Sequence, residues 1–408
     1  MKILFLDAYF EPEQIAFTHL EHDLLQGLVD DGHEVEIVCP TPTRGISIEE
    51  AQKYKWIRSE TIYDGHVQVT RFSAPVERKN PIIRALRYFW CNLRTYQIGK
   101  KAKNVDVVFA NSTPPTQGLI AGKVAKKHKV PFIYSLQDIF PDSLITTGFT
   151  KHGSFLWKIG REIENATYKR CSRIIVISNN MKDNLLRKGV RKEKIEVISN
   201  WIDLDKIRPI SKEDNLLFDE FGINRGKFIV LYAGNFGAAQ GAEIVLDVAE
   251  ALLVDESIFF VIFGGGSGYN AAEEKACRLS NVFIHPLLPQ EKVSNVYSMG
   301  DVNLITCKKG VGNSGMPSKT WSIMACNSPI IASFDTDSEL SNVLSEAKAG
   351  FIVEPGNIES IKSKIIEISK NKESNNINSR DYVMKNASRP ICVKQYIKMF
   401  SLLANKNN

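Results

Sequence analysis

The chain has 408 residues, of which 43% are hydrophobic and 24% are charged, and this globular composition excludes an intrinsically disordered protein. Lys and Arg exceed Asp and Glu by 52 − 46 = 6, an excess too small for this length to indicate nucleic-acid binding. The 7 cysteines are scattered without a C-x-x-C pair, which disfavours a disulfide framework or a zinc cluster and fits a reducing compartment.

Short β-rich runs alternate with helical segments through the first half of the chain. A helix is predicted over residues 20–31, where leucines recur at helical spacing and a glycine follows. The expected strands cover residues 2–6, 34–39, 105–110, 132–136, 173–177 and 194–198. This alternation predicts a parallel sheet that is covered by helices.

A second series of the same kind follows a polar, proline-containing segment at residues 200–214, which we interpret as a linker. Its expected strands cover residues 228–233, 258–263, 282–285, 302–306, 330–333 and 350–353. Residues 381–403 read as one or two further helices. At about 100–200 residues per domain, the length also favours two domains. The first strand is too short for a signal peptide, and no apolar run reaches the length of a membrane span.

Ligands of such sheets bind at the carboxyl ends of the strands, so the loops after the strands are the candidate sites. The loop at 234–241 follows a buried strand and contains small residues whose amides could face a phosphate. A plain tight turn is an equally good interpretation of this loop. Its candidate residues are Gly234, Asn235, Phe236, Gly237 and Gln240.

The segment at 306–320 combines a strand end, glycines and lysines, a combination suited to a diphosphate. The alternative is that these lysines are solvated surface residues, and we favour binding. Its candidates are Lys308, Lys309, Gly315, Met316 and Lys319. The glycines at 264–268 lack G-x-G-x-x-G spacing, and the chain has neither a P-loop nor a G-x-S-x-G elbow, which disfavours dinucleotide enzymes, P-loop proteins and serine hydrolases.

Polar residues also end a strand of the first half, where Gln137 and Asp138 follow residues 132–136. The Asp138 carboxylate could accept a sugar hydroxyl or act as a base, or it could cap the next helix. The histidines form no ligand set, and the Asp-x-Asp triplets at 203–205 and 335–337 are too common to indicate a metal. We therefore predict no metal site.

Residues 81–103 carry basic and aromatic residues without an acidic one. Such a helix can lie on an anionic membrane surface, or its aromatic side chains can pack onto its own domain. The residues expected to form a membrane patch are Arg84, Arg87, Trp90 and Arg94.

Several motifs in chain order resemble one known family. They are GHEV at 32–35, STPP at 112–115, QDIFPD at 137–142, ISNWID at 198–203, YAGNFG at 232–237 and MPSKT at 316–320. With these motifs the chain resembles the retaining GT-B glycosyltransferases of family 4, and within them a bacterial branch similar to the N-acetyl-L-fucosamine transferases of O-antigen and capsule synthesis. The resemblance covers nearly the whole chain.

The resemblance implies an α/β GT-B fold with two Rossmann-like domains across a cleft. It implies an acceptor-binding domain at 1–203, a nucleotide-sugar-binding domain at 204–385 and a C-terminal helix at 386–408 that packs back on the first domain. The implied donor is a nucleotide sugar, commonly of UDP, and the implied acceptor is a polyprenyl-diphosphate-linked saccharide. No metal or other cofactor is expected. The protein would be cytoplasmic and peripheral on the inner face of the bacterial plasma membrane.

The chain departs from the family at several functional positions. The family's diphosphate-binding Arg and Lys are replaced by Asn235 and Gln240, and its two glutamates by Ser314 and Ser322. The family's histidine of the first domain aligns with Gln137. We therefore assign catalytic roles to Gln137, Asp138 and Lys319. Ribose or sugar contacts are assigned to Ser314, Pro317, Ser318, Ser322 and Glu339, and the acceptor side to Glu13, Gln14 and Thr18.

Retention in this family is commonly explained by front-face attack, in which the leaving phosphate takes the acceptor's proton. The protein then needs to position the reactants and to stabilise the charge on the departing diphosphate. Two alternatives stay open at this point. One is a nucleotide-sugar 2-epimerase, which shares the GT-B fold, and the other is a non-catalytic scaffold relative.

Overall fold

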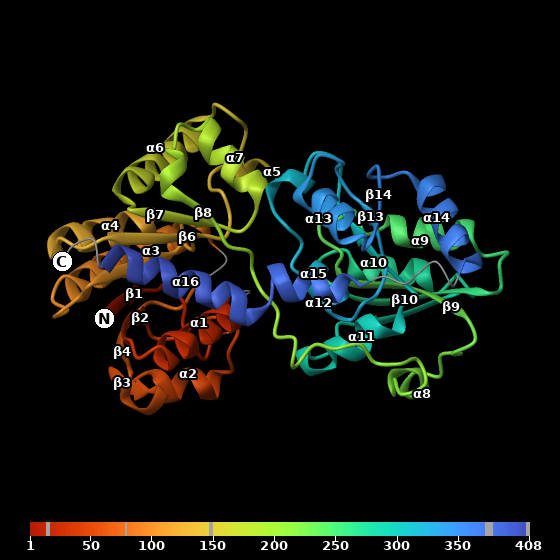
Figure 1. Cartoon of the computed structure of the whole chain (residues 1–408), viewed down its shortest axis with the longest axis horizontal. Helices are drawn as coiled ribbons and strands as arrows, with labels where there is room; N and C mark the ends of the chain where they lie inside the picture. Colours follow the sequence, from red (N-terminus) through yellow and green to blue (C-terminus); the bar gives the residue numbers. More distant parts are fainter. Residues whose placement is uncertain (14–16, 78–79, 147–149, 372–377, 405–408) are drawn as a thin grey trace. The chain divides into compact units, whose positions relative to one another are not determined.

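The computed structural model describes residues 1–13, 17–77, 80–146, 150–371 and 378–404 (Figure 1). The chain forms two compact units, one of Met1–Ser199 with Cys392–Asn408 and one of Asn200–Ile391. Each unit is built on its own sheet. In the described part of the chain, no helix is both long enough and apolar enough to span a bilayer.

The first unit contains an eight-stranded sheet with the order β3-β4-β2-β1-β5-β6-β7-β8. All neighbouring strands are parallel except β3 and β4, which are antiparallel. The strands are β1 (Lys2–Leu6), β2 (Glu34–Pro40), β3 (Ser59–Ile62), β4 (Val67–Phe72), β5 (Val107–Asn111), β6 (Phe132–Leu136), β7 (Arg173–Val176) and β8 (Ile195–Val197). The central strands are buried on both faces, which explains why their sequences are nearly continuous apolar runs.

Helices connect the strands of this sheet. Helix α1 buries Leu20, Leu24, Leu25 and Leu28, as the helical spacing of the leucines predicts. Side chains cap several of the other helices, among them Asn80 before α3 and Ser178 before α7. The helices are α1 (Thr18–Asp30), α2 (Ile48–Tyr54), η1 (Tyr63–Gly65), α3 (Pro81–Gly99), α4 (Gln117–His128), α5 (Asp142–Thr146), α6 (Phe155–Arg170), α7 (Asn179–Arg187) and η2 (Lys192–Lys194).

The second unit contains a six-stranded parallel sheet with the order β11-β10-β9-β12-β13-β14. Its strands are β9 (Phe228–Asn235), β10 (Ile258–Gly265), β11 (Val282–Pro286), β12 (Val302–Thr306), β13 (Ile330–Ser333) and β14 (Gly350–Val353). Its helices are α8 (Leu217–Glu220), α9 (Ile244–Ala251), α10 (Tyr269–Ala276), η3 (Gln290–Lys292), α11 (Val293–Met299), η4 (Gly312–Ser314), α12 (Lys319–Ala325), α13 (Glu339–Ala347), α14 (Ile358–Lys370) and α15 (Ser379–Asn386). Two doubly wound parallel sheets confirm the predicted α/β fold class.

The topology of both sheets marks where ligands bind. In the first sheet the strand order reverses direction between β1 and β5, and in the second sheet between β9 and β12. Loops that leave adjacent strands at such a switch point diverge to opposite faces and open a crevice at the carboxyl edge. The loops after β9 and β12 are those that the sequence analysis proposes for a diphosphate.

The segment expected to be a linker packs on the second unit. The Arg380 guanidinium of α15 donates to the carbonyl oxygens of Leu204 and Ile207 at 2.7 Å each. The amides of Arg208 and Ile210 donate to the hydroxyls of Ser294 and Ser298 on α11. These bonds hold residues 204–210 on the unit that follows them in the chain.

The last helix, α16 (Arg389–Ala404), ends the chain on the first unit (Figure 1). The Tyr396 hydroxyl lies 3.3 Å from the Ser135 hydroxyl, and the Phe400 ring packs on Phe5 and Phe109. Gly27 of α1 leaves the space that the Val393 side chain of α16 fills. The helix thus completes the core of the unit formed by the start of the chain.

Strands β3 and β4 of the first unit are absent from the sequence prediction. Strand β3 has no fully buried residue, and β4 alternates apolar with polar residues across only six positions. Both strands lie at one edge of the sheet, where a continuous apolar run is not required.

We expect Phe400→Ala to lower the free energy of unfolding of the first unit by about 3–5 kcal/mol, because it opens a cavity between α16 and the sheet. Leu402→Ala, at an exposed position of the same helix, should change it by less than about 0.5 kcal/mol. Urea titration of both variants checks this, and equal effects would contradict the docking of α16 on the first unit.

Candidate active site

The loops after β9 and β12 contact each other within the second unit. The Lys308 amide donates to the Ala239 carbonyl oxygen at 3.0 Å. Gly241 lies against the Lys308 side chain at a backbone φ of +57°, where a methyl group would be strained. The two loops therefore form one surface at the switch point of the sheet.

Lys319, the first residue of α12, points its ammonium at the end of β9. A methyl group at Gly234 would collide with Lys319 Nζ, so a glycine is what leaves room for this ammonium. The same nitrogen lies 4.4 Å from the centroid of the Tyr232 ring, a cation–π distance. The Tyr232 hydroxyl in turn donates to the Asn235 carbonyl oxygen at 2.9 Å.

Electrostatics make Lys319 unusual among the lysines of this unit. Burial lowers the pKa of Lys319 to about 8. Within the described residues, no carboxylate pairs with its ammonium. Lys319 is half-buried, and a partly desolvated cation without a counter-ion is costly, so an anionic ligand would relieve that cost.

Asp335 holds the loop that precedes α12. Its carboxylate accepts from the amides of Gly310 at 2.9 Å and Gly312 at 2.7 Å. A methyl group at Gly312 would approach the Phe334 ring to 2.7 Å, so glycine is required there. In the sequence, Asp335 belongs to an Asp-x-Asp triplet that is too common to indicate a site. Its position two residues after a buried strand is the signal that could have identified it.

Phe236 has a structural role instead of the predicted phosphate contact. Its buried ring packs edge-on against Tyr232 and Tyr269. Its amide donates to the Gly265 carbonyl oxygen at 2.7 Å, and its carbonyl oxygen accepts from Gly268. Because that amide is engaged, it cannot serve a phosphate. Phe236 joins the glycine loops after β9 and β10.

The other predicted donor-side residues lie around these loops with different exposure. Asn235 and the side chains of Lys308, Lys309 and Ser318 are exposed, and Gly237, Gln240, Gly315, Met316, Pro317, Ser322 and Glu339 are half-buried. The Gln240 side chain folds over Gly237, and Met316 packs against the core of the unit. Ser322 follows Lys319 by one helical turn, and Glu339 begins α13. The side chain of Ser314 lies outside the described part of the structure.

Gln137 and Asp138 follow β6 of the first unit, as predicted. The Gln137 amide donates to the Ser112 hydroxyl at 3.1 Å, and its side chain donates to the Ser135 hydroxyl at 3.2 Å. The exposed Asp138 carboxylate accepts a hydrogen bond from Ser143 on α5. This side-chain bond links the carboxylate to α5 and is not itself a cap on a backbone amide of that helix.

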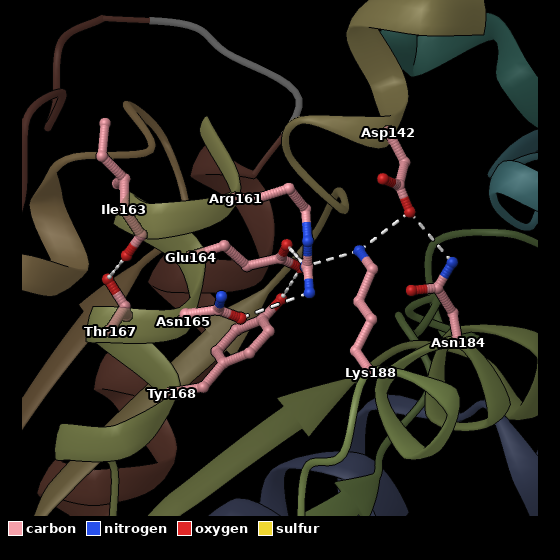
Figure 2. Close-up of polar contacts among 9 residues, drawn as sticks. All are labelled: Asp142, Arg161, Ile163, Glu164, Asn165, Thr167, Tyr168, Asn184 and Lys188. Atoms are coloured by element: carbon pink, nitrogen blue, oxygen red, sulfur yellow. Dashed lines mark hydrogen bonds and ion pairs between the residues drawn. The ribbon is translucent and has the colours of Figure 1, made fainter. Parts of the chain in front are cut away.

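A charged cluster fixes the loop that carries these two residues. Figure 2 shows the Lys188 ammonium between two carboxylates, 2.8 Å from Asp142 and 2.9 Å from Glu164. Glu164 also accepts from Arg161 and from the Tyr168 hydroxyl. Burial lowers the pKa of Lys188 to about 8, although Asp142 opposes this shift. Burial alone would raise the pKa of Asp142, but Lys188 holds it below its usual value. The cluster ties α5 to α6 and to the end of α7.

The predicted acceptor-side residues lie between β1 and α1. The Glu13 carboxylate is buried and accepts from the amides of Thr43 at 2.7 Å and Arg44 at 2.8 Å. The Thr18 hydroxyl donates to the Glu13 carbonyl oxygen. Gln14 lies outside the described residues. The Glu13 side chain thus holds the loop after β2.

Helix α3 exposes much of the predicted membrane patch, with one correction. Arg84 and Trp90 are exposed, and Arg94 is half-buried. The expectation is wrong for Arg87, which is 1% exposed and donates to the Pro75 carbonyl oxygen and the Thr43 hydroxyl. Charge counting along the sequence could not separate the buried arginine from its exposed neighbours.

No three His, Cys, Asp or Glu side chains come together as a metal ion would require among the residues that the structure describes. The anion-binding features are concentrated at the β9–β12 switch point of the second unit.

Two family models match consecutive parts of the chain. The model described as "Glycosyltransferase Family 4" matches residues 21–206, and the model described as "Glycosyl transferases group 1" matches residues 213–389. The second match contains the loops around Lys319 and Asp335 described above.

Curated relatives carry similar descriptions. The putative colanic acid biosynthesis glycosyl transferase WcaI of Escherichia coli K12 is 24% identical over 97% of this chain and 99% of its own. The probable glycosyltransferase WbjE of Pseudomonas aeruginosa is 25% identical over 73% of this chain and 75% of its own.

Among solved structures, HepE from Anabaena in complex with UDP matches with a TM-score of 0.73 at 15% identity, over 99% of this chain and all of the other. Sucrose-phosphate synthase from Thermosynechococcus elongatus matches with a TM-score of 0.74 at 14% identity, over 98% of both chains. These likenesses establish the GT-B fold. The two family models and the relatives, on this fold, identify the chain as a glycosyltransferase of the GT-B type.

Proposed function

We propose that this protein is a retaining, metal-independent glycosyltransferase that moves a sugar, an N-acetylated amino sugar by its resemblance, from a UDP-sugar to a lipid-linked saccharide of a bacterial cell-surface polysaccharide. The observation that carries the donor assignment is the half-buried Lys319, whose ammonium lies against Gly234 with no carboxylate partner among the described residues. Solved neighbours of the same fold hold UDP or UDP-glucose, and WcaI is described as a colanic acid enzyme.

The proposed chemistry follows from the charge that grows on a departing diphosphate. Lys319 and the amides of the Gly234 and Gly315 loops would stabilise that charge in a partly desolvated site. The leaving phosphate would itself accept the proton of the acceptor hydroxyl, so no strong protein base is required. This assignment gives Lys319 the role that a diphosphate-bound metal has in other transferases.

The proposed acceptor is held by the first unit and is carried on a polyprenyl diphosphate. Helix α3 supports a membrane-bound acceptor because it exposes apolar side chains beside basic ones. Phe89 is 70% exposed and Leu86 is 65% exposed, with Arg84 on the same helix. Exposed apolar residues flanked by basic ones are typical of helices that lie on an anionic bilayer.

We expect Lys319→Met to weaken UDP binding by about 10- to 150-fold, since a charge-assisted hydrogen bond contributes about 1.5–3 kcal/mol. Turnover should fall by about 10²–10³-fold. Calorimetry with UDP and a transfer assay measure the two effects, and Lys370→Met, at an exposed lysine of α14, is the matched control. Wild-type affinity and rate in Lys319→Met would reject the assignment.

UDP binding should also depend on pH through Lys319. Because the free protein holds this lysine at a pKa of about 8, and bound diphosphate favours its charged form, affinity should be nearly constant below pH 7 and fall by about tenfold between pH 7 and 9. Lys319→Arg keeps its charge, so its affinity should not change over this range. The same slope in Lys319→Arg would show that another group titrates.

A third prediction concerns the membrane. The double variant Leu86→Ser and Phe89→Ser should reduce the fraction that floats with anionic liposomes by at least about tenfold, because it removes two exposed apolar side chains. Val254→Ser, at an exposed apolar residue of the second unit, is the control. Unchanged flotation would exclude α3 as the contact.

A further inference from the structure

The carboxyl end of β1 carries a pair of buried acids that the donor chemistry does not use. Asp7, directly after β1, is 2% exposed, and Glu21, in the first turn of α1, is 3% exposed. The two carboxyl groups are neighbours, since each shifts the pKa of the other. The Asn111 amide at the end of β5 donates to Asp7 Oδ1 at 3.2 Å. The pair therefore sits at the switch point of the first sheet, between β1 and β5.

Contact between these two buried acids requires a proton. Two ionised carboxylates only accept hydrogen bonds, so one of the pair must be protonated for the contact to form. Asp7 Oδ2 and Glu21 Oε1 are both buried and have no other donor within the described residues. No Lys, Arg or His side chain there forms an ion pair with either acid. Two buried like charges without a cation are strongly unfavourable, so the proton is the group that makes the arrangement stable.

The charged groups that surround the pair are engaged with one another. Arg71 of β4 pairs with Glu60 and donates to the Glu11 carbonyl oxygen, and Glu11 pairs with His22 of α1. The remaining titratable neighbours are Glu13, whose carboxylate accepts two backbone amides, and the buried Cys39 thiol of β2. None of these groups supplies a counter-charge to Asp7 or Glu21.

We propose that Asp7 and Glu21 act as one unit that holds a single proton and thereby fixes the first turn of α1 to the carboxyl end of β1. The two acids are positioning residues for the β1–α1 junction. Their relevance to the acceptor rests on the proposed function, which places the acceptor on this unit. Loss of the shared proton would leave two buried carboxylates in contact and would release α1 from the sheet.

The pH dependence has a definite sign. Burial raises the pKa of Asp7 to about 7, and burial with the Asp7 charge raises the pKa of Glu21 well above its usual value. An acid with a raised pKa in the folded state contributes stability that is fully present below about pH 4 and is lost as the pH rises through the folded value. The ratio of folded to unfolded protein should fall by up to about tenfold per pH unit for each extra proton that the folded state holds.

The test uses the full chain with Glu21→Gln, Asp7→Asn and Glu21→Ala. An amide donates the hydrogen bond that the protonated acid donates, so Glu21→Gln and Asp7→Asn should keep the fold and flatten the pH dependence of urea unfolding of the first unit between pH 5 and 8. Glu21→Ala should unfold more easily at every pH. His22→Gln should keep the wild-type slope, which separates the pair from the nearby histidine.

A second readout observes the proton itself. Infrared spectra at pH 6 should contain the carbonyl stretch of a protonated carboxylic acid, shifted in D₂O, in the wild type and not in Glu21→Gln or Asp7→Asn. Absence of this band in the wild type, or Glu21→Gln as unstable as Glu21→Ala, would overturn the proposal. Both readouts are independent of transfer activity. A protein without sugar transfer would reject the proposed function and leave the proton pair standing.

Discussion

The site of the second unit depends on one unpaired cation. Lys319 Nζ lies against Gly234 and the Tyr232 ring, where burial disfavours its charge and no described carboxylate offsets it. Lysines elsewhere in this unit are solvated or paired, as Lys212 is with Asp301. A ligand with negative charge removes the conflict, because it replaces the missing counter-ion and the lost water together. The loops around Lys319 keep this ammonium in place and accessible to an anion.

Backbone and carboxylate contacts provide that support. Asp335 fixes the loop before α12 through two glycine amides, and Phe236 fixes the end of β9 through the loop after β10. Glycines occupy the positions where a side chain would strike Lys319 Nζ or the Phe334 ring. The glycine content of these loops therefore has a steric cause at defined positions. Phe236 lies among the predicted phosphate-loop residues but holds the loops together, whereas Asp335 would not be selected by a search for phosphate-binding glycines.

The sequence predicted the fold well because apolar runs and leucine spacing report burial directly. It also proposed Lys319 and Gly234 as candidates, and the structure brings these two residues into contact although they are far apart in the chain. It missed Asp335 because a strand-end carboxylate that binds backbone amides has no fixed local pattern. It placed Arg87 on the surface because a buried arginine and an exposed one look alike without their partners. Asp7 and Glu21 were hidden for the same reason, since each borders an apolar segment and their pairing depends on the packing of α1.

Buried charges are compensated by neighbouring groups in the first unit, whereas Lys319 of the second unit has no carboxylate partner among the described residues. In the first unit, Lys188 is neutralised by two carboxylates, Arg71 by Glu60, and the Asp7–Glu21 pair by a proton. These charges are balanced within the unit, so they stabilise loops and helix ends and do not demand a ligand. In the second unit, Lys319 is left unbalanced. A buried charge that the chain itself does not compensate is the feature that distinguishes a binding site from a structural ion pair. By that criterion Lys319 is the position to which we assign the proposed donor phosphates, whereas the polar clusters of the first unit need no ligand to balance their charge.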